Sequence, residues 1–214
     1  PKYRQFDLTE YENPCELAVM WSRGCIGRCV FCEVKPLVKG FRQRSAEKIF
    51  EEIKHYLENL GIAEYSVYDS MINGDIKVLE KLCDMIIKSD LEVRWSAQFV
   101  PYQDLPLKFY KKMRAAGCHR LEFGLESGSD KVLKKMGKII TVKNAEKKLD
   151  RIHKAGIITV LFVIVGFPGE DEKDFDATLD FVKKNRVNID HIQSVNELHV
   201  INYSKINTDP LKFN

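Results

Sequence analysis

Three cysteines, Cys25, Cys29 and Cys32, lie within eight residues of one another and could bind a metal or an iron–sulfur cluster. Cysteine thiolate is the usual ligand of iron–sulfur clusters, and a 4Fe–4S cluster held wholly by protein uses four thiolates. Three thiolates therefore leave one iron with vacant positions. The spacing indicates a cluster whose open iron could bind a small molecule.

Zinc is the alternative for this segment. A structural zinc site closes with four ligands, whereas no cysteine or histidine follows Cys32 before His55, which falls in a predicted helix. The remaining cysteines, Cys15, Cys83 and Cys118, lack clustered spacing, and we expect them to be small buried side chains. The segment therefore favours an iron–sulfur cluster over zinc.

The elements that would position these cysteines alternate along the chain. Near-continuous apolar stretches predict buried parallel strands, and stretches of 3.6-residue periodicity predict helices, such as one at 45–60 with Ser45 as N-cap and Gly61 past its end. We count six strand–helix units, with strands near residues 17–21, 65–68, 93–99, 120–124, 157–165 and 191–201. This pattern predicts an α/β fold, a partial six-unit parallel barrel related to the eight-unit strand–helix barrel.

Polar or conformationally special residues follow the predicted strands. In such a barrel the site lies at the carboxyl ends of the strands. The residues at these ends are Asp69 and Ser70, Ser96 and Gln98, Glu126 and Ser127, the segment 166–170, and Glu197 and His199. We therefore expect a catalytic mouth around the cysteine segment, although each position taken alone also fits an ordinary polar loop.

The composition limits the classes of protein to which this chain can belong. The chain has 214 residues, 44% hydrophobic and 30% charged, with a formal net charge of +3 and interleaved charges, which argues neither for nor against a nucleic-acid partner. The apolar run 157–165 is shorter than the ~20 residues of a membrane span, and the amino terminus lacks the pattern of a signal peptide. We expect a cytoplasmic protein with no membrane partner.

The domain organisation follows from the same pattern. Residues 17–201 are expected to form the barrel as one domain. Residues 1–16 are expected to be an amino-terminal extension or linker, and residues 202–214 a carboxy-terminal extension, because both lack clear periodicity. Both ends look cut from a longer protein.

The cysteine spacing and two later segments resemble a known family. Cys-x3-Cys-x2-Cys with Phe31 before the third cysteine resembles the signature of the radical S-adenosylmethionine (SAM) superfamily, and residues 124–136 and 163–170 are similar to segments of its cobalamin-dependent and methylthiotransferase-like subgroup. The resemblance implies a 4Fe–4S cluster whose open iron is chelated by the amino and carboxylate groups of SAM. It also implies an external electron donor such as flavodoxin or ferredoxin. Cleavage of SAM would yield a 5′-deoxyadenosyl radical that attacks a substrate the sequence does not identify.

The resemblance assigns roles to individual residues. It implies that Phe31 lies beside the adenine of SAM and that Glu126 and Ser127 contact its ribose or amino group. It implies that the fifth strand backs the adenine through Ile164, Gly166 and Pro168.

The family pattern fits two further positions, Asp69 and Arg44, less closely. Asp69 stands where the family presents a polar group to the methionine amino end, but much of the family has a Gly-Glu pair where this chain has Tyr68 and Asp69. Arg44, with Arg42, could meet the cofactor carboxylate at the barrel mouth, since arginine suits bidentate carboxylate binding. The alternative for both arginines is a solvated surface position.

Within the superfamily, the resemblance favours a cobalamin-dependent enzyme of methyl transfer or rearrangement, whose cobalamin-binding domain would precede Pro1. RNA methylthiolation is an alternative, for which we would expect a second cluster domain and an RNA-binding domain that this chain does not contain. A third possibility is a metal-binding interaction module that has lost chemistry. The polar residues at the strand ends argue against it, because such a module has no physical need of them.

Overall fold

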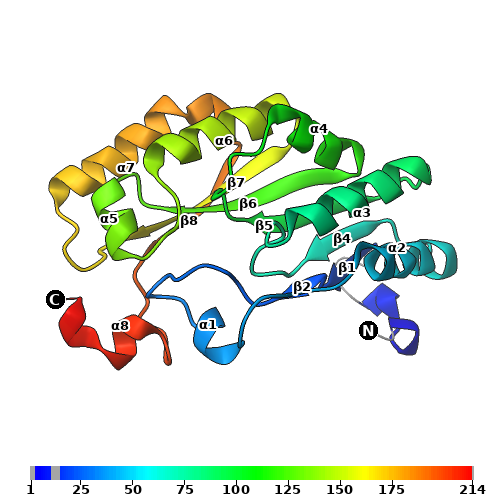
Figure 1. The fold of residues 1–214 in the computed structure, drawn as a ribbon, viewed down its shortest axis with the longest axis horizontal. Coiled ribbons are helices and arrows are strands. Elements are labelled where there is room, and N and C mark those ends of the chain that lie inside the picture. Colours follow the sequence, from blue (N-terminus) through cyan, green and yellow to red (C-terminus); the bar gives the residue numbers. More distant parts are fainter. Residues whose placement is uncertain (1–2, 11–14, 214) are drawn as a thin grey trace.

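The computed structural model describes residues 3–10 and 15–213, and its centre is one sheet of six parallel strands in the order β1-β4-β5-β6-β7-β8 (Figure 1). The strands of this sheet are β1 (Glu16–Val19), β4 (Glu64–Val67), β5 (Arg94–Phe99), β6 (Cys118–Glu126), β7 (Ile158–Val165) and β8 (His191–Glu197). All six predicted strands are therefore present, in chain order across the sheet.

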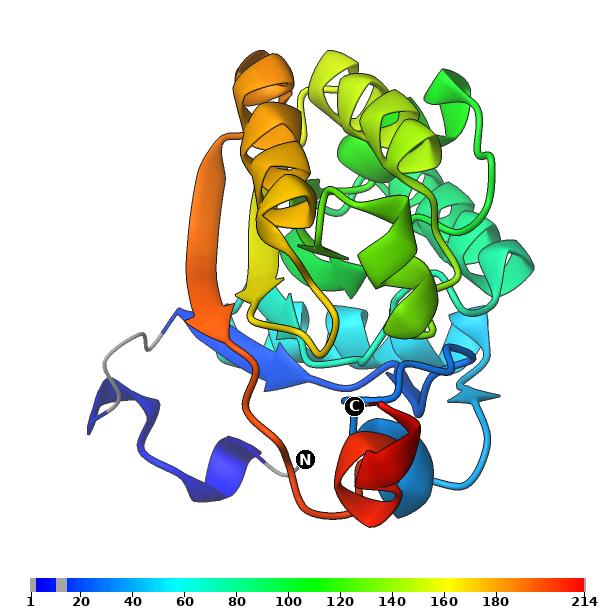
Figure 2. The same ribbon diagram turned by 90° about the vertical axis from the view of Figure 1, so that its left-hand side faces the viewer.

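Helices connect successive strands of this sheet, and one short helix, α8, follows the last strand. The helices are α1 (Val34–Leu37), α2 (Ala46–Leu60), α3 (Ile76–Lys88), α4 (Leu107–Ala115), α5 (Asp130–Lys135), α6 (Val142–Lys154), α7 (Glu172–Lys184) and α8 (Lys205–Thr208). The longer helices α2, α3, α4, α6 and α7 form a layer along the sheet, and the short helices α1 and α8 lie together away from this layer (Figures 1 and 2). One side of the sheet is thus buried by helices, and the other is left for a site.

The sequence explains where these helices begin and end. Ser45 caps α2 by accepting a hydrogen bond from the backbone N–H of Lys48, and Gly61 ends it in the left-handed conformation with φ of 67°. Both predicted caps are confirmed. None of the helices in the described ranges combines the length and apolar character that crossing a membrane requires.

The core lies between the sheet and the helical layer. Large side chains such as Trp21, Trp95, Tyr65, Phe99 and Tyr110 are fully buried there. The rings of Trp21 and Trp95 meet edge to face with centroids 5.5 Å apart. Burial of each such aromatic side chain contributes about 1.5–3 kcal/mol to folding, so the outer face of the sheet is a rigid support.

Two short strands close the cysteine segment at its base. Strand β2 (Ser22–Arg23) pairs antiparallel with β3 (Arg42–Gln43), so that residues 24–41, including the cysteines and α1, form one loop. Neither this ribbon nor α1 was predicted from the sequence, because elements of two to four residues leave no periodic signal.

Other boundaries also differ from expectation. Strand β6 runs from Cys118 to Glu126, longer than the expected 120–124, because its alternate residues are polar and face away from the core. Strand β8 ends at Glu197 rather than residue 201. Residues 202–214 were expected to form a carboxy-terminal extension, and the short helix α8 lies within this range.

Candidate functional site

The cysteine loop and the carboxyl ends of the strands enclose a cavity of about 390 Å³. This volume is in the range of small-molecule sites. Its walls come from the cysteine loop, from the end of β4, and from β5, β6, β7 and β8, including Ser70, Gln98, Glu126, Ile164 and Asn196. A cavity therefore lies where the mouth was predicted, with Ser194 and Asn196 of β8 in its wall instead of Glu197 and His199.

All three clustered cysteines line this cavity and are partly exposed to it. The backbone N–H of Gly27 lies 3.3 Å from Cys25 Sγ, and that of Val34 lies 3.4 Å from Cys32 Sγ. The hydrogen bond from Val34 favours the thiolate form of Cys32, the form that binds iron. The cysteine loop therefore folds with its sulfur atoms directed to one space.

Burial affects the pKa of two of these thiols, those of Cys29 and Cys32. Burial raises the pKa of Cys29, and the ammonium of Lys138 offsets part of this effect. Burial also raises the pKa of Cys32, partly offset by its hydrogen bond from Val34. Iron binding must therefore displace protons from these thiols, as metal sites with thiolate ligands do.

The donor set fits an iron–sulfur cluster. In the part of the chain that the structure describes, no three Cys, His, Asp or Glu side chains converge on one point like the ligands of a single ion. A cluster holds each thiolate on a different iron, so its ligands surround a volume and need not converge. Three soft sulfur donors around one cavity satisfy this requirement.

The other cysteines are separate from this site. Cys83 and Cys118 are buried in the main core, as expected. Cys15 is exposed, so the expectation of a buried side chain was wrong there. It precedes the first residue of β1, where the chain has not yet entered the sheet.

A buried ion pair lines the same cavity as the cysteines. Lys138 Nζ lies 3.1 Å from Glu126 Oε1 and donates to the carbonyl of Gly124 at 2.8 Å, and both charged side chains are largely buried. Burial disfavours the charge of Lys138, but Glu126 and the thiols of Cys29 and Cys25 hold its pKa above the ordinary value. A positive charge is thus held beside the predicted cluster ligands.

Glu126 also has an unusual backbone conformation. Its φ is 68°, in the left-handed region that residues other than glycine rarely adopt. Such strain at the end of a strand is typical of functional sites. Glu126 was predicted as a site residue, whereas Lys138, one lysine among many, carries no local pattern that would have identified it.

Of the other seven predicted cofactor residues, two line the cavity and five do not. Phe31 and Ile164 lie in the cavity wall, from the cysteine loop and from β7. Ser127 is fully buried outside it, where its Oγ lies 3.3 Å from Thr178 Oγ1 and accepts from the backbone N–H of Ser129. Gly166 and Pro168 follow Ile164 in the next loop and are absent from the cavity wall.

Asp69 supports the cysteine loop and does not line the cavity. Its side chain, 1% exposed, accepts a hydrogen bond of 2.8 Å from the backbone N–H of Trp21, just before the loop begins. Burial raises the pKa of Asp69, and contacts with Ser22 and Trp21 partly offset this effect. The neighbouring Ser70 is the residue of this segment that reaches the cavity.

Arg44 lies outside the cysteine cavity. Its guanidinium pairs with Glu52 of α2 at 2.5 Å and donates to the carbonyl of Met20, in a second hollow that Arg42 also lines. The structure therefore brings neither arginine to the place expected for the cofactor carboxylate. Lys138 is the cation that lines the cavity.

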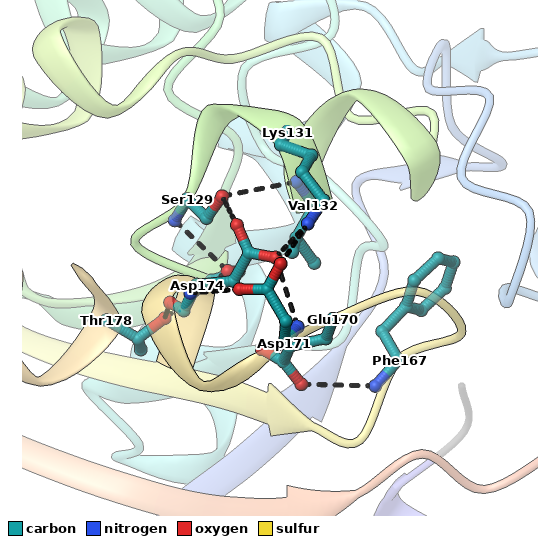
Figure 3. A network of polar contacts seen from close by, with 9 residues as sticks. Ser129, Lys131, Val132, Phe167, Glu170, Asp171, Asp174 and Thr178 are labelled. Carbon is teal, nitrogen blue, oxygen red and sulfur yellow. Dashed lines mark hydrogen bonds and ion pairs between the residues drawn. The ribbon is translucent and has the colours of Figure 1, made fainter. Parts of the chain in front are cut away.

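The loop after β7 is held by a polar network that Figure 3 shows from close by. Glu170 accepts hydrogen bonds from the backbone N–H groups of Gly166 and Phe167, at 2.6 and 3.2 Å. Asp174 of α7 accepts from Ser129 Oγ at 2.7 Å and from Lys131 Nζ at 2.6 Å. The network joins the loop that continues the cavity wall to the start of α5.

Comparison with known proteins places this site in a family. A model described as the Radical SAM superfamily matches residues 19–182. An uncharacterized methyltransferase of Pyrococcus horikoshii is 32% identical over 176 residues, covering 82% of this chain and 38% of the relative. The ribosomal protein uS12 methylthiotransferase RimO of Acetivibrio thermocellus is 31% identical over 177 residues, covering 76% and 38%. The chain thus spans about two fifths of the length of these curated relatives.

A solved structure agrees with the fold. The radical SAM methyltransferase TsrM of Kitasatospora setae, solved with cobalamin and a 4Fe–4S cluster bound, matches with a TM-score of 0.74 at 22% identity, covering 88% of this chain and 35% of that chain. Together with the six parallel strands, this likeness confirms the predicted α/β partial barrel. The chain belongs to the radical SAM superfamily, whose enzymes use a 4Fe–4S cluster and SAM.

Proposed function

We propose that this chain is the catalytic core of a radical SAM methyltransferase that depends on cobalamin. The observation that carries the proposal is the meeting of three cysteines with the buried Glu126–Lys138 pair in one cavity. The methyltransferase relative and the likeness to TsrM support the reaction class.

The residues of the cavity have distinct tasks in this proposal. Cys25, Cys29 and Cys32 would hold the cluster, which when reduced supplies the electron that cleaves SAM to methionine and a 5′-deoxyadenosyl radical. Glu126 offers its carboxylate as a hydrogen-bond acceptor. Lys138 uses two donors on protein oxygens, so one of its three N–H groups is left for a carboxylate.

The apolar wall would orient the rest of the cofactor. Phe31 and Ile164 line the same cavity from the cysteine loop and β7 and offer flat or branched apolar surface to an adenine ring. Exclusion of water by this wall would protect a radical from side reactions. The protein thus contributes orientation and enclosure.

Partners and location belong to the same proposal. We infer an external electron donor such as flavodoxin or ferredoxin and a cobalamin-binding domain outside the described residues. A cytoplasmic location fits, because the thiols must stay reduced to bind iron.

Methylthiolation is the second candidate. The identity of 31% with a ribosomal protein methylthiotransferase favours it specifically. Cobalamin binding by the full-length protein discriminates between the two: stoichiometric binding supports the methyltransferase, and a second iron–sulfur cluster without cobalamin supports methylthiolation.

Anaerobic reconstitution with iron and sulfide tests the proposed function. After reduction by dithionite, we expect the protein to convert SAM to 5′-deoxyadenosine or, with cobalamin supplied, to S-adenosylhomocysteine, measured by liquid chromatography. The variant Cys32→Ala should form neither product. Tight binding of zinc with no uptake of iron by the intact protein would contradict the proposal.

A further inference from the structure

The cysteine loop is held by two distant parts of the chain at a single residue, Val30. The backbone N–H of Val30 donates to the carbonyl of Met136 at 2.9 Å, at the end of α5. Its carbonyl accepts from the backbone N–H of Ile206 at 3.0 Å, in α8. Both backbone groups of a residue that lies between Cys29 and Cys32 are therefore satisfied from outside the loop.

The side chains of these residues form a small apolar cluster separate from the main core. Ile206, 5% exposed, packs with Val30, Val132, Met136 and Phe167. Phe213, from the end of the described chain, packs against the same cluster. The carboxy-terminal segment, residues 204–213, is therefore anchored on the cysteine loop by apolar burial as well as by a hydrogen bond.

The contact with α5 is rigid. A Cβ on Gly137 would lie 2.7 Å from the carbonyl oxygen of Arg28, so the turn after α5 fits against the loop only with glycine at this position. The turn continues into Lys138, which is fixed on Gly124 and Glu126. This side of the loop is held by the barrel itself.

The contact of Val30 with α8 is separate from its contact with the end of α5. Ile206 lies in the first turn of its helix, where backbone N–H groups have no partner within the helix. That N–H is directed to Val30 instead. Ser204, fully buried, fixes the start of α8 by donating from its Oγ to the carbonyl of Ile201 at 2.6 Å.

We propose that the segment 204–213 is a clamp that positions the cluster-binding cysteines, with Ile206 as its positioning residue. This inference rests on the proposed function. Because Val30 is held on both sides, Cys29 and Cys32 lose freedom before the cluster binds, which lowers the entropic cost of binding. If the contacts of this clamp are weakened, all three thiols remain present but their positions are less fixed.

The test compares three substitutions in the same segment. Ile206→Ala removes the side chain that packs on Val30, Ile206→Val keeps most of it, and Leu211→Ala changes a side chain that is 86% exposed. Each reconstituted protein is mixed anaerobically with an iron chelator, and iron release is followed by absorbance. We expect release about tenfold faster for Ile206→Ala because local opening becomes easier. Ile206→Val should stay within about twofold of the wild type and Leu211→Ala should not differ from it.

A second readout needs no cluster. In the apoprotein, alkylation by iodoacetamide, followed by mass spectrometry, should be faster at Cys29 and Cys32 in Ile206→Ala, but unchanged at Cys83 in the main core. Faster alkylation at Cys83 as well would indicate global destabilisation and overturn the inference. So would wild-type rates of iron release and alkylation in Ile206→Ala. If the wild type takes up no iron, the proposed function fails, whereas the alkylation result still decides the clamp.

Discussion

The pairing of Glu126 with Lys138 shows how single residues shape the site. Glu126 could be predicted from its place after a strand and from the family pattern, but its partner could not. Lys138 reaches the pair only because the chain turns at Gly137, a contact that depends on the tertiary fold. The same limit applies to Asp69. Its position at the end of a strand was predicted correctly, but its hydrogen-bond partner, the backbone N–H of Trp21, could not be predicted.

Removing one charge of this pair should lower the free energy of unfolding more than removing both. In Lys138→Met the buried carboxylate of Glu126 loses its counter-charge, and we expect the unfolding free energy of the apoprotein to fall by about 3–5 kcal/mol. The double variant Lys138→Met with Glu126→Gln should lose less unfolding free energy than Lys138→Met alone. Denaturant unfolding measures each value. Simple additivity would contradict a coupled pair.

The ligand assignment predicts a contrast between two cysteines. Cys29→Ala removes a thiol that lines the cavity and should abolish retention of a 4Fe–4S cluster. Cys83→Ala changes a buried core residue and should retain about four irons per chain. Iron and sulfide analysis after gel filtration gives both values. Equal iron contents in the two variants would refute the assignment.

Helix α7 is the element whose first turn is most clearly stabilised by charged side chains. Asp171 and Asp174 form a capping box there, and Lys131 of α5 bridges both carboxylates. The hydrogen bonds from Lys131 and Ser129 lower the pKa of Asp174 to about 2. This arrangement, seen in Figure 3, ties two elements that flank the cavity and are far apart in sequence.

The lowered pKa predicts how stability changes with acid. The contribution of Asp174 is complete above its ordinary pKa of 3.8 and is lost as the pH falls toward 2. Asp174→Asn should therefore lower the unfolding free energy at pH 7 by about 2 kcal/mol. The difference from wild type should shrink between pH 4 and pH 2, as measured by urea unfolding. A difference that does not depend on pH would contradict this role.

The elements that could be predicted are those with a periodic pattern and recognisable ends. Helix α2 begins and ends at its predicted caps, and each predicted strand pairs in the sheet. Helix α8 was not predicted, because it is a single turn whose stability comes from the contact of Ile206 with Val30. The ribbon of β2 and β3 was missed for the same reason: its pairing joins residues that lie on either side of the cysteine loop.

In the molecule as a whole, the helices that support the sheet and the cysteine loop of the candidate site lie on different sides of the sheet. Helices cover one side of the sheet, and the cysteine loop and α8 lie on the other (Figures 1 and 2). Strand β8 is an edge strand and is largely exposed. The chain spans about two fifths of the length of its curated relatives.

The most direct test of an open-iron cluster held by three cysteines is electron paramagnetic resonance of the reconstituted, reduced protein with and without SAM. We expect about four irons per chain, the signal of a reduced 4Fe–4S cluster, and a change in its g values when SAM binds to the open iron. The same signal with and without SAM, or a cluster that survives in Cys29→Ala, would contradict the account.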